Sequence, residues 1–170
     1  LSDSEYNKRV EECQEALKII NDSGYKIKFL TQIDVEELRK IQNLMPDNIF
    51  NRALYVTQEN NRTIQSVEHL KNLDLKSLGN LMYSSHNGLR DLYEVSCDEL
   101  DYLVDKTIIY DQILGARMMG GGFGGCTINL IHKDFIDTFV TDVSESYSNM
   151  FSLELSPIIT SLGEGLRYKV

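Results

Sequence analysis

The residues with the clearest potential for chemistry form a glycine-dense segment from Gly120 to Gly125, in which only Phe123 is not glycine. Ordering a glycine costs about 0.5–1 kcal/mol relative to alanine, so such a segment indicates a close backbone approach or positive φ angles. Phosphate is a common target, because successive backbone N–H groups can form an anion-binding nest. The alternative is a flexible hairpin turn, although hairpin loops usually have only about 2–5 residues.

Two phosphate-binding motifs are excluded by the residues that come after the glycines. Gly120, Gly122 and Gly125 match the G-x-G-x-x-G dinucleotide fingerprint, but that fingerprint must open a helix whose N-terminus faces the pyrophosphate. Here Cys126–Ile131 alternates in part between polar and apolar residues, which predicts a strand. A Walker A loop is also excluded, because the sequence has no Gly-Lys-Ser/Thr after the glycines.

The cysteines and histidines predict no further site. The three cysteines are an odd number and widely spaced, which fits neither a disulfide framework nor a zinc motif, and predicts reduced thiols in a cytoplasmic protein. No two of the three histidines are four residues apart, so we expect no helical metal site. These residues are Cys13, Cys97, Cys126, His69, His86 and His132.

Composition excludes several classes of partner. The chain has 170 residues, 42% of them hydrophobic, and a net charge of −9. Without a basic patch or stripe we expect no nucleic-acid partner. No stretch of about 18 apolar residues is present, so we expect no membrane span. The polar, acidic start is not a signal peptide, and the missing initial Met predicts a piece of a longer protein.

Helices are expected to position the glycine segment. Capping pairs predict helix starts at Ser2 with Glu5, at Asp34 with Glu37, and at Ser96 with Glu99. Asp74 and Asp134 are expected to cap two further helices, and Pro46 to precede a long helix through Phe50, Leu54, Ile64 and Val67. Ser23-Gly24 ends the first helix, and residues 25–30 form a strand or an extended linker.

Strands concentrate late in the sequence. They are predicted at residues 126–131, 153–160 and 166–170, whereas residues 116–119 form only a short and partly apolar stretch. Helices followed by strands favour an α+β fold with an antiparallel sheet over a doubly wound parallel one. We find no internal repeat, and one domain over residues 1–170 accounts for the pattern.

Five blocks together resemble galactokinases of the GHMP kinase family, in order and in spacing. Residues 115–126 resemble the third GHMP motif, and the others are residues 4–9, 52–63, 78–86 and 89–101. The resemblance covers essentially the whole chain. It implies a GHMP kinase C-terminal domain, with an antiparallel sheet covered by helices, over residues 1–170.

The resemblance also implies an activity: ATP-dependent phosphorylation of the 1-hydroxyl of galactose, with Mg²⁺. In the family the serine-rich phosphate loop and the catalytic Asp lie in the N-terminal half. Neither is found in this sequence, so the resemblance assigns no catalytic residue and no metal ligand to this chain. The expected partners are galactose, ATP and the N-terminal half of the same protein, and the chain alone is expected to be inactive and to bind neither ATP nor Mg²⁺ tightly.

Site residues come from the same resemblance. Tyr6 matches a tyrosine whose hydroxyl contacts the sugar; the alternative is packing at the junction of the two lobes. The active-site loop consists of Gly120, Gly121, Gly122, Phe123, Gly124 and Gly125, which either contact ligand or support the site from behind. Arg117 matches the family without an assigned role, and a surface or interlobe ion pair is its default. His86, Arg90 and Asp91 are interpreted as structural.

Two positions depart from the family pattern, and two other functions stay open. Met119 stands where the family usually has Thr, and Gly88 where Ser is common, which we expect to weaken the helix end. Phe123 with Met118 is more similar to galactokinase than to the N-acetylgalactosamine kinase branch. The alternative functions are a non-catalytic galactose sensor and a GHMP kinase for another small alcohol or sugar.

Overall fold

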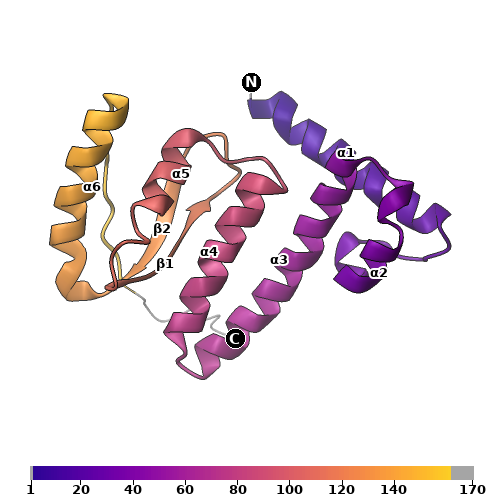
Figure 1. Ribbon diagram of the computed structural model, residues 1–170, viewed down its shortest axis with the longest axis horizontal. Helices are drawn as coiled ribbons and strands as arrows, with labels where there is room; N and C mark the ends of the chain where they lie inside the picture. Colours follow the sequence, from indigo (N-terminus) through magenta and orange to yellow (C-terminus); the bar gives the residue numbers. More distant parts are fainter. Residues whose placement is uncertain (1, 162–170) are drawn as a thin grey trace, which may run out of the picture. The chain divides into compact units, whose positions relative to one another are not determined.

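The computed structural model describes residues 2–161, with side chains from Glu5 onward. Within this range the chain forms two compact units that divide after Lys133, and each is described by itself. The first unit contains the glycine segment and its supporting helices (Figure 1). Its elements are α1 (Ser2–Asp22), η1 (Leu30–Gln32), α2 (Val35–Lys40), η2 (Gln42–Leu44), α3 (Asp47–Lys71), α4 (Leu75–Asp91), α5 (Asp98–Asp105), β1 (Ile113–Met119) and β2 (Cys126–Ile131).

Several predicted helix ends are confirmed. The Asp34 side chain accepts a hydrogen bond from the backbone N–H of Glu37 at 2.8 Å and starts α2. Asp74 does the same for Ser77 at 3.1 Å and starts α4. Gly24 follows α1 with a φ of 108°, the left-handed conformation that suits glycine at a helix end. The side chain of Ser2 lies outside the described part, so its capping pair with Glu5 stays a prediction.

Two other caps were predicted wrongly. The N-cap of α5 is Cys97 without a side-chain bond, because the Ser96 hydroxyl donates instead to the Asp101 carboxylate at 2.5 Å. Asp134 lies inside the short turn η3 (Lys133–Phe135), so α6 (Ile136–Phe151) begins two residues later, with Phe135 at its N-cap. In both cases another local structure uses the residue that sequence alone offered as a cap.

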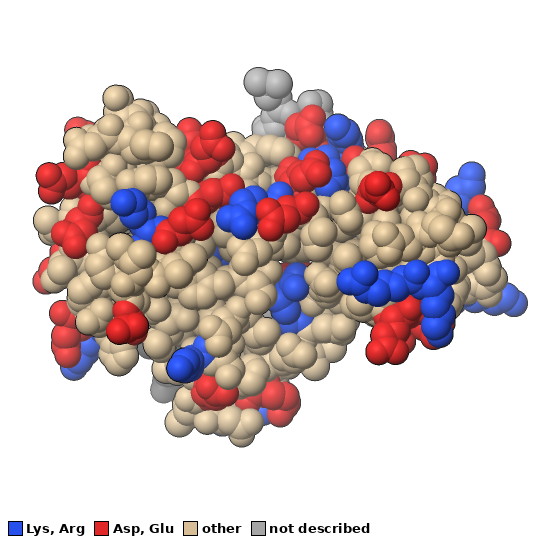
Figure 2. All heavy atoms as spheres, in the orientation of Figure 1, with Lys and Arg blue, Asp and Glu red and all other residues tan. Residues whose placement is uncertain are grey.

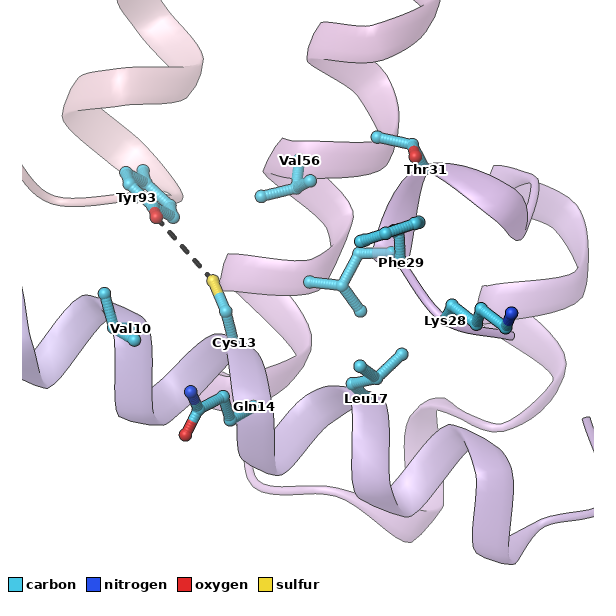
Figure 3. A pocket seen from close by; sticks show the side chains of 10 residues that line it. Val10, Cys13, Gln14, Leu17, Lys28, Phe29, Thr31, Val56 and Tyr93 are labelled. Carbon is cyan, nitrogen blue, oxygen red and sulfur yellow. Dashed lines mark hydrogen bonds between the residues drawn. The ribbon is translucent and has the colours of Figure 1, made fainter. Parts of the chain in front are cut away.

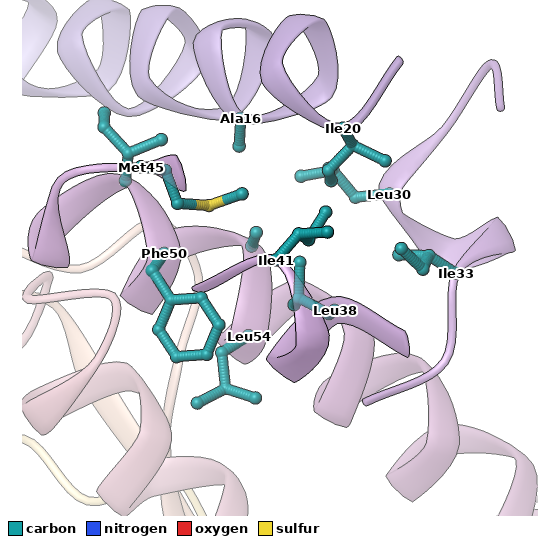
Figure 4. Packing of buried hydrophobic residues seen from close by; sticks show 11 residues of the cluster. Ala16, Ile20, Leu30, Ile33, Leu38, Ile41, Met45, Phe50 and Leu54 are labelled. Carbon is teal, nitrogen blue, oxygen red and sulfur yellow. The ribbon is translucent and has the colours of Figure 1, made fainter. Parts of the chain in front are cut away.

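The helices α1, α2 and α3 enclose one hydrophobic core (Figure 4). Ala16 and Ile20 of α1 are fully buried, as the helical spacing of the apolar residues predicts. They face Leu38 of α2 and Phe50 and Leu54 of α3. Residues 25–29 contain no strand. Of the two predicted alternatives, a strand and an extended linker, the linker is therefore correct. This core fixes α1 against α3, and α1 carries Tyr6.

The sheet consists of β1 and β2, which pair antiparallel from Ile113↔Ile131 to Met119↔Cys126 with an irregularity between Ile113 and Gly115. Helix α4 packs along β1, and the two backbones meet at Gly79 and Gly115. A Cβ on Gly79 would overlap the carbonyl oxygen of Leu114. Glycine at both positions therefore permits the helix to lie directly on the strand.

The predicted strand at residues 153–160 is wrong. The described residues 152–161 contain no strand, and the side chains of Ile158 and Ile159 are 91% and 62% exposed. Alternating residues predict a strand only if another strand supplies backbone hydrogen bonds, and Pro157 has no N–H to donate. The strand predicted at residues 166–170 lies outside the described residues.

In the second unit, α6 carries Phe139, Val143 and Tyr147 on one face at a spacing of four residues.

Acidic and basic side chains are interspersed on the face shown in Figure 2. Acidic residues outnumber basic ones, 26 to 17, in the whole sequence. Of the helices in the described residues, none has the length and apolar content that crossing a membrane requires.

Candidate functional site

The glycine segment is the loop that joins β1 to β2. Gly120 and Gly122 have a φ of +89°, Gly124 of +122° and Gly125 of +107°, conformations that glycine adopts without strain. Phe123 is also left-handed, with a φ of 57°, which is uncommon for a bulky residue. The loop is thus a six-residue hairpin connection. Since β2 comes directly after it, exclusion of the dinucleotide fingerprint is confirmed.

The loop has a packed side and an open side. A Cβ on Gly121 would overlap the Tyr6 ring, and one on Gly122 would overlap the carbonyl oxygen of Val95. By contrast, a Cβ on Gly120 or Gly124 would meet nothing within 4 Å. Gly121 and Gly122 therefore hold the loop to the molecule, while Gly120 and Gly124 leave the backbone open to approach.

Tyr6 lies against this loop. Its ring packs edge-on against Phe123, with centroids 5.8 Å apart and planes at 86°. Its hydroxyl lies over Gly121, and the residue stays 39% exposed. The structure thus brings together the two features that the family resemblance selected, although Tyr6 and Gly120 lie 114 positions apart in sequence.

The turn at residues 92–95, directly after α4, contacts the glycine loop and supports it. The Phe123 N–H donates to the Val95 carbonyl at 2.7 Å, and Val95 is 3% exposed. The two residues before Val95 accept hydrogen bonds from Arg9 of α1: the Tyr93 carbonyl from Nε at 2.7 Å, and the Glu94 carbonyl from Nη2 at 2.7 Å. Arg9 and Val95 are site-supporting residues that sequence reasoning missed.

A buried ionic network reinforces the turn. Arg52 of α3, 2% exposed, donates to the Glu12 carboxylate at 2.8 Å, to the Glu94 carboxylate at 2.9 Å and to the Leu92 carbonyl at 2.5 Å. Burial alone would raise the pKa of Glu12, but the hydrogen bond and charge of Arg52, together with the Asn48 hydrogen bond and the Arg9 charge, outweigh it and lower that pKa. Glu12 therefore stays ionised between Arg52 and Arg9.

Arg117 precedes the loop in β1 and forms the ion pair that was its default role. Its Nη1 lies 3.1 Å from Glu59 of α3, which also accepts from Arg62 and from the Ser85 hydroxyl. Met119, where the family usually has Thr, ends the strand ladder opposite Cys126 and is 49% exposed.

His86 and Gly88 have structural surroundings. His86 is fully buried and accepts from the Met118 N–H at Nδ1, and burial lowers its pKa, which keeps it neutral. This placement favours its structural interpretation. A Cβ on Gly88 would lie 2.8 Å from the Tyr55 ring. Gly88 makes room for that ring, and the expectation that it weakens the helix end stays a prediction.

An open apolar hollow of about 440 Å³ lies beside α1 (Figure 3). Val10, Cys13 and Leu17 line it from α1, with Phe29 and Tyr93 opposite. Burial raises the pKa of the Cys13 thiol, so it is protonated at neutral pH. The Cys13 thiol lies 3.6 Å from the Tyr93 hydroxyl, and among the lining residues only Lys28 carries a full charge, so we do not treat the hollow as a candidate for chemistry.

Comparison with known proteins agrees with this geometry. Residues 66–149 match the family model described as GHMP kinases C terminal. This chain carries a GHMP kinase C-terminal domain. The matched range includes α4, β1, the glycine loop and β2.

Curated relatives of this chain include galactokinases. The Fusobacterium nucleatum galactokinase is 39% identical over 166 residues, which cover 97% of this chain and 43% of the relative. The Thermotoga neapolitana galactokinase is 42% identical over 156 residues, covering 92% and 42%. A solved structure of Lactococcus lactis galactokinase complexed with galactose matches with a TM-score of 0.85 and 34% identity, covering 89% of this chain and 39% of that one.

The GHMP kinase resemblance and the α+β fold class are therefore confirmed. The chain spans less than half the length of the relatives it matches. The remainder of those relatives has no counterpart in these 170 residues.

Proposed function

We propose that this chain, residues 1–170, is the C-terminal domain of a galactokinase that transfers phosphate from ATP to the 1-hydroxyl of galactose. The observation that carries the proposal is the contact between Tyr6 and the glycine loop, in a chain whose relatives are galactokinases along almost its full length. The catalytic base lies in the N-terminal half of the longer protein.

Tyr6 is the residue that we assign to galactose. A ring that is 39% exposed, with its hydroxyl beside the open loop, suits a hydrogen bond to a sugar hydroxyl. The relative from Lactococcus lactis was solved with galactose, which supports a sugar as the ligand.

The glycine loop fits the approach of a phosphate, because the backbone at Gly120 and Gly124 faces open space. Among the described residues no group of three His, Cys, Asp or Glu side chains could hold a metal ion. ATP supplies the phosphoryl group with Mg²⁺, and we place the Mg²⁺ ligands in the N-terminal half. This domain positions the sugar and keeps water from the reacting groups.

A galactose sensor without catalytic activity is the alternative that this domain separates least from a kinase. Such a protein would use Tyr6 and the loop in the same way and differ in the half that carries the base. A kinase for another small alcohol or sugar would differ from a galactokinase in the ligand that Tyr6 contacts.

Replacing Tyr6 with phenylalanine in the full-length protein should raise the KM for galactose about two- to twelvefold and leave kcat within a few-fold. The substitution keeps the ring against Phe123 and removes one neutral hydrogen bond, a loss of about 0.5–1.5 kcal/mol. Because ground state and transition state both use that bond, the loss is uniform binding. Steady-state kinetics with each substrate varied in turn will measure it.

The ATP KM is the internal control for this experiment and should stay within twofold. An unchanged galactose KM would reduce Tyr6 to a packing residue. A change in the ATP KM alone would place its hydroxyl on the nucleotide instead of the sugar.

A further inference from the structure

We propose that Arg9 is a positioning residue: through the turn at residues 92–95, it sets the distance between Tyr6 and the glycine loop. The inference rests on the proposed function for its link to galactose, but not for its structural step. Arg9 does not touch the open side of the loop. It acts through the backbone of Tyr93 and Glu94.

The contacts lead from α1 through the turn to the glycine loop and back to α1. Tyr6 and Arg9 lie three residues apart, so they occupy neighbouring positions on one face of α1. The Arg9 guanidinium bonds the carbonyls of Tyr93 and Glu94, and the next carbonyl, that of Val95, accepts from Phe123. Phe123 then returns to Tyr6 through the ring contact.

The geometry of Glu94 shows that the turn is held in place. Its φ is 53°, a left-handed conformation that few non-glycine residues adopt. Arg9 holds its carbonyl and Arg52 holds its carboxylate. Strain of this kind persists only where several surrounding contacts hold the residue in place. The turn that contains Glu94 supports the glycine loop of the proposed site.

Burial makes the Arg9 bonds strong. The side chain is 7% exposed and its Nη1 lies 3.1 Å from Glu12, which is 8% exposed. Hydrogen bonds from a charged group are roughly twice as strong as neutral ones. Two of them on consecutive carbonyls, both 2.7 Å, fix the orientation of the peptide as well as its position.

Arg9→Lys separates positioning from charge pairing. Lysine keeps a cation beside Glu12 but cannot reproduce the planar fork that reaches two carbonyls. Arg9→Met removes the cation too and is the stronger variant. Arg39→Met, at an exposed position in α2, is the matched control for loss of an arginine.

Hydrogen exchange at residue resolution in the full-length protein tests the structural step. In Arg9→Lys, protection of the Phe123 N–H should fall about tenfold more than that of the Phe50 N–H of α3, which donates to the carbonyl of the N-cap Pro46. Arg39→Met should change neither. Equal losses at Phe123 and Phe50 would mean that Arg9 contributes only global stability, and that result, like no loss at all, would overturn the proposal.

Kinetics tests the consequence in the same variants. We expect the galactose KM of Arg9→Lys to rise about tenfold, with the ATP KM within twofold, because a displaced Tyr6 loses its sugar contact. A normal galactose KM alongside a displaced loop would overturn the link to the site. If the parent protein has no galactose-dependent activity, the proposed function fails, and the exchange result alone decides whether Arg9 positions the loop.

Discussion

Replacing Gly122 with alanine in the full-length protein should lower kcat/KM for galactose phosphorylation about a hundredfold, a loss typical of site groups displaced by about 1 Å. Gly122 has a φ of +89°, and a Cβ there would overlap the Val95 carbonyl that holds Phe123. The left-handed conformation alone costs about 1–2 kcal/mol. The overlap forces the loop away from its support and from Tyr6.

Gly24→Ala is the matched control. Gly24 has a φ of +108°, but a Cβ there meets nothing within 4 Å and the residue follows α1, far along the chain from the loop. The Gly24→Ala variant should lose about 1–2 kcal/mol of folding stability and keep its activity. Steady-state kinetics and thermal melting on both variants will separate the effect of backbone strain at a positive φ from the effect of Cβ overlap with the Val95 carbonyl. Near-normal activity of Gly122→Ala with unchanged melting would show that the loop is only a turn.

Replacing Gly79 with alanine should destabilise the fold by about 3 kcal/mol, the upper end of the usual range for overpacking. A Cβ would overlap the backbone carbonyl of Leu114, so α4 and β1 must separate along their contact. Alanine gains about 1 kcal/mol of helix propensity over glycine, and the loss should appear despite that gain. Urea unfolding followed by circular dichroism gives the free energy of unfolding.

Gly88→Ala provides the comparison within the same helix. It has the same propensity gain, but its Cβ meets the ring of Tyr55 at 2.8 Å and not a backbone atom. A side chain can shift where a backbone cannot, so we expect a smaller loss than at Gly79. Equal stability losses at the two positions would contradict the close approach of α4 and β1.

Local features of this fold were predictable from sequence because their causes are local. Asp34 and Asp74 cap helices through the N–H three residues later, and glycine permits the positive φ that four of the five glycines of the loop adopt. The predictions failed where a residue had a competing partner, as Ser96 has in Asp101. They failed also at residues 153–160, where alternation cannot say whether a neighbouring strand exists.

The support of the site was not predictable from the residues alone. The Arg9 bonds join residues 84 and 85 positions apart, and their acceptors are carbonyls, which every residue type carries. The same holds for the Val95 carbonyl beneath Phe123. The contact between Tyr6 and the loop could be expected only from the family resemblance, because a lone tyrosine in a helix gives no sign of its partner.

The most direct test of the proposed function is ADP release, measured with ATP, Mg²⁺ and a panel of sugars, by the full-length protein and by this 170-residue chain. We expect galactose-dependent turnover from the full-length protein, little with glucose or N-acetylgalactosamine, and none from the chain alone, because no catalytic base is assigned to it. Galactose-dependent turnover by the isolated chain near the full-length rate would contradict that assignment. A full-length protein that binds galactose without turnover would instead be a sensor.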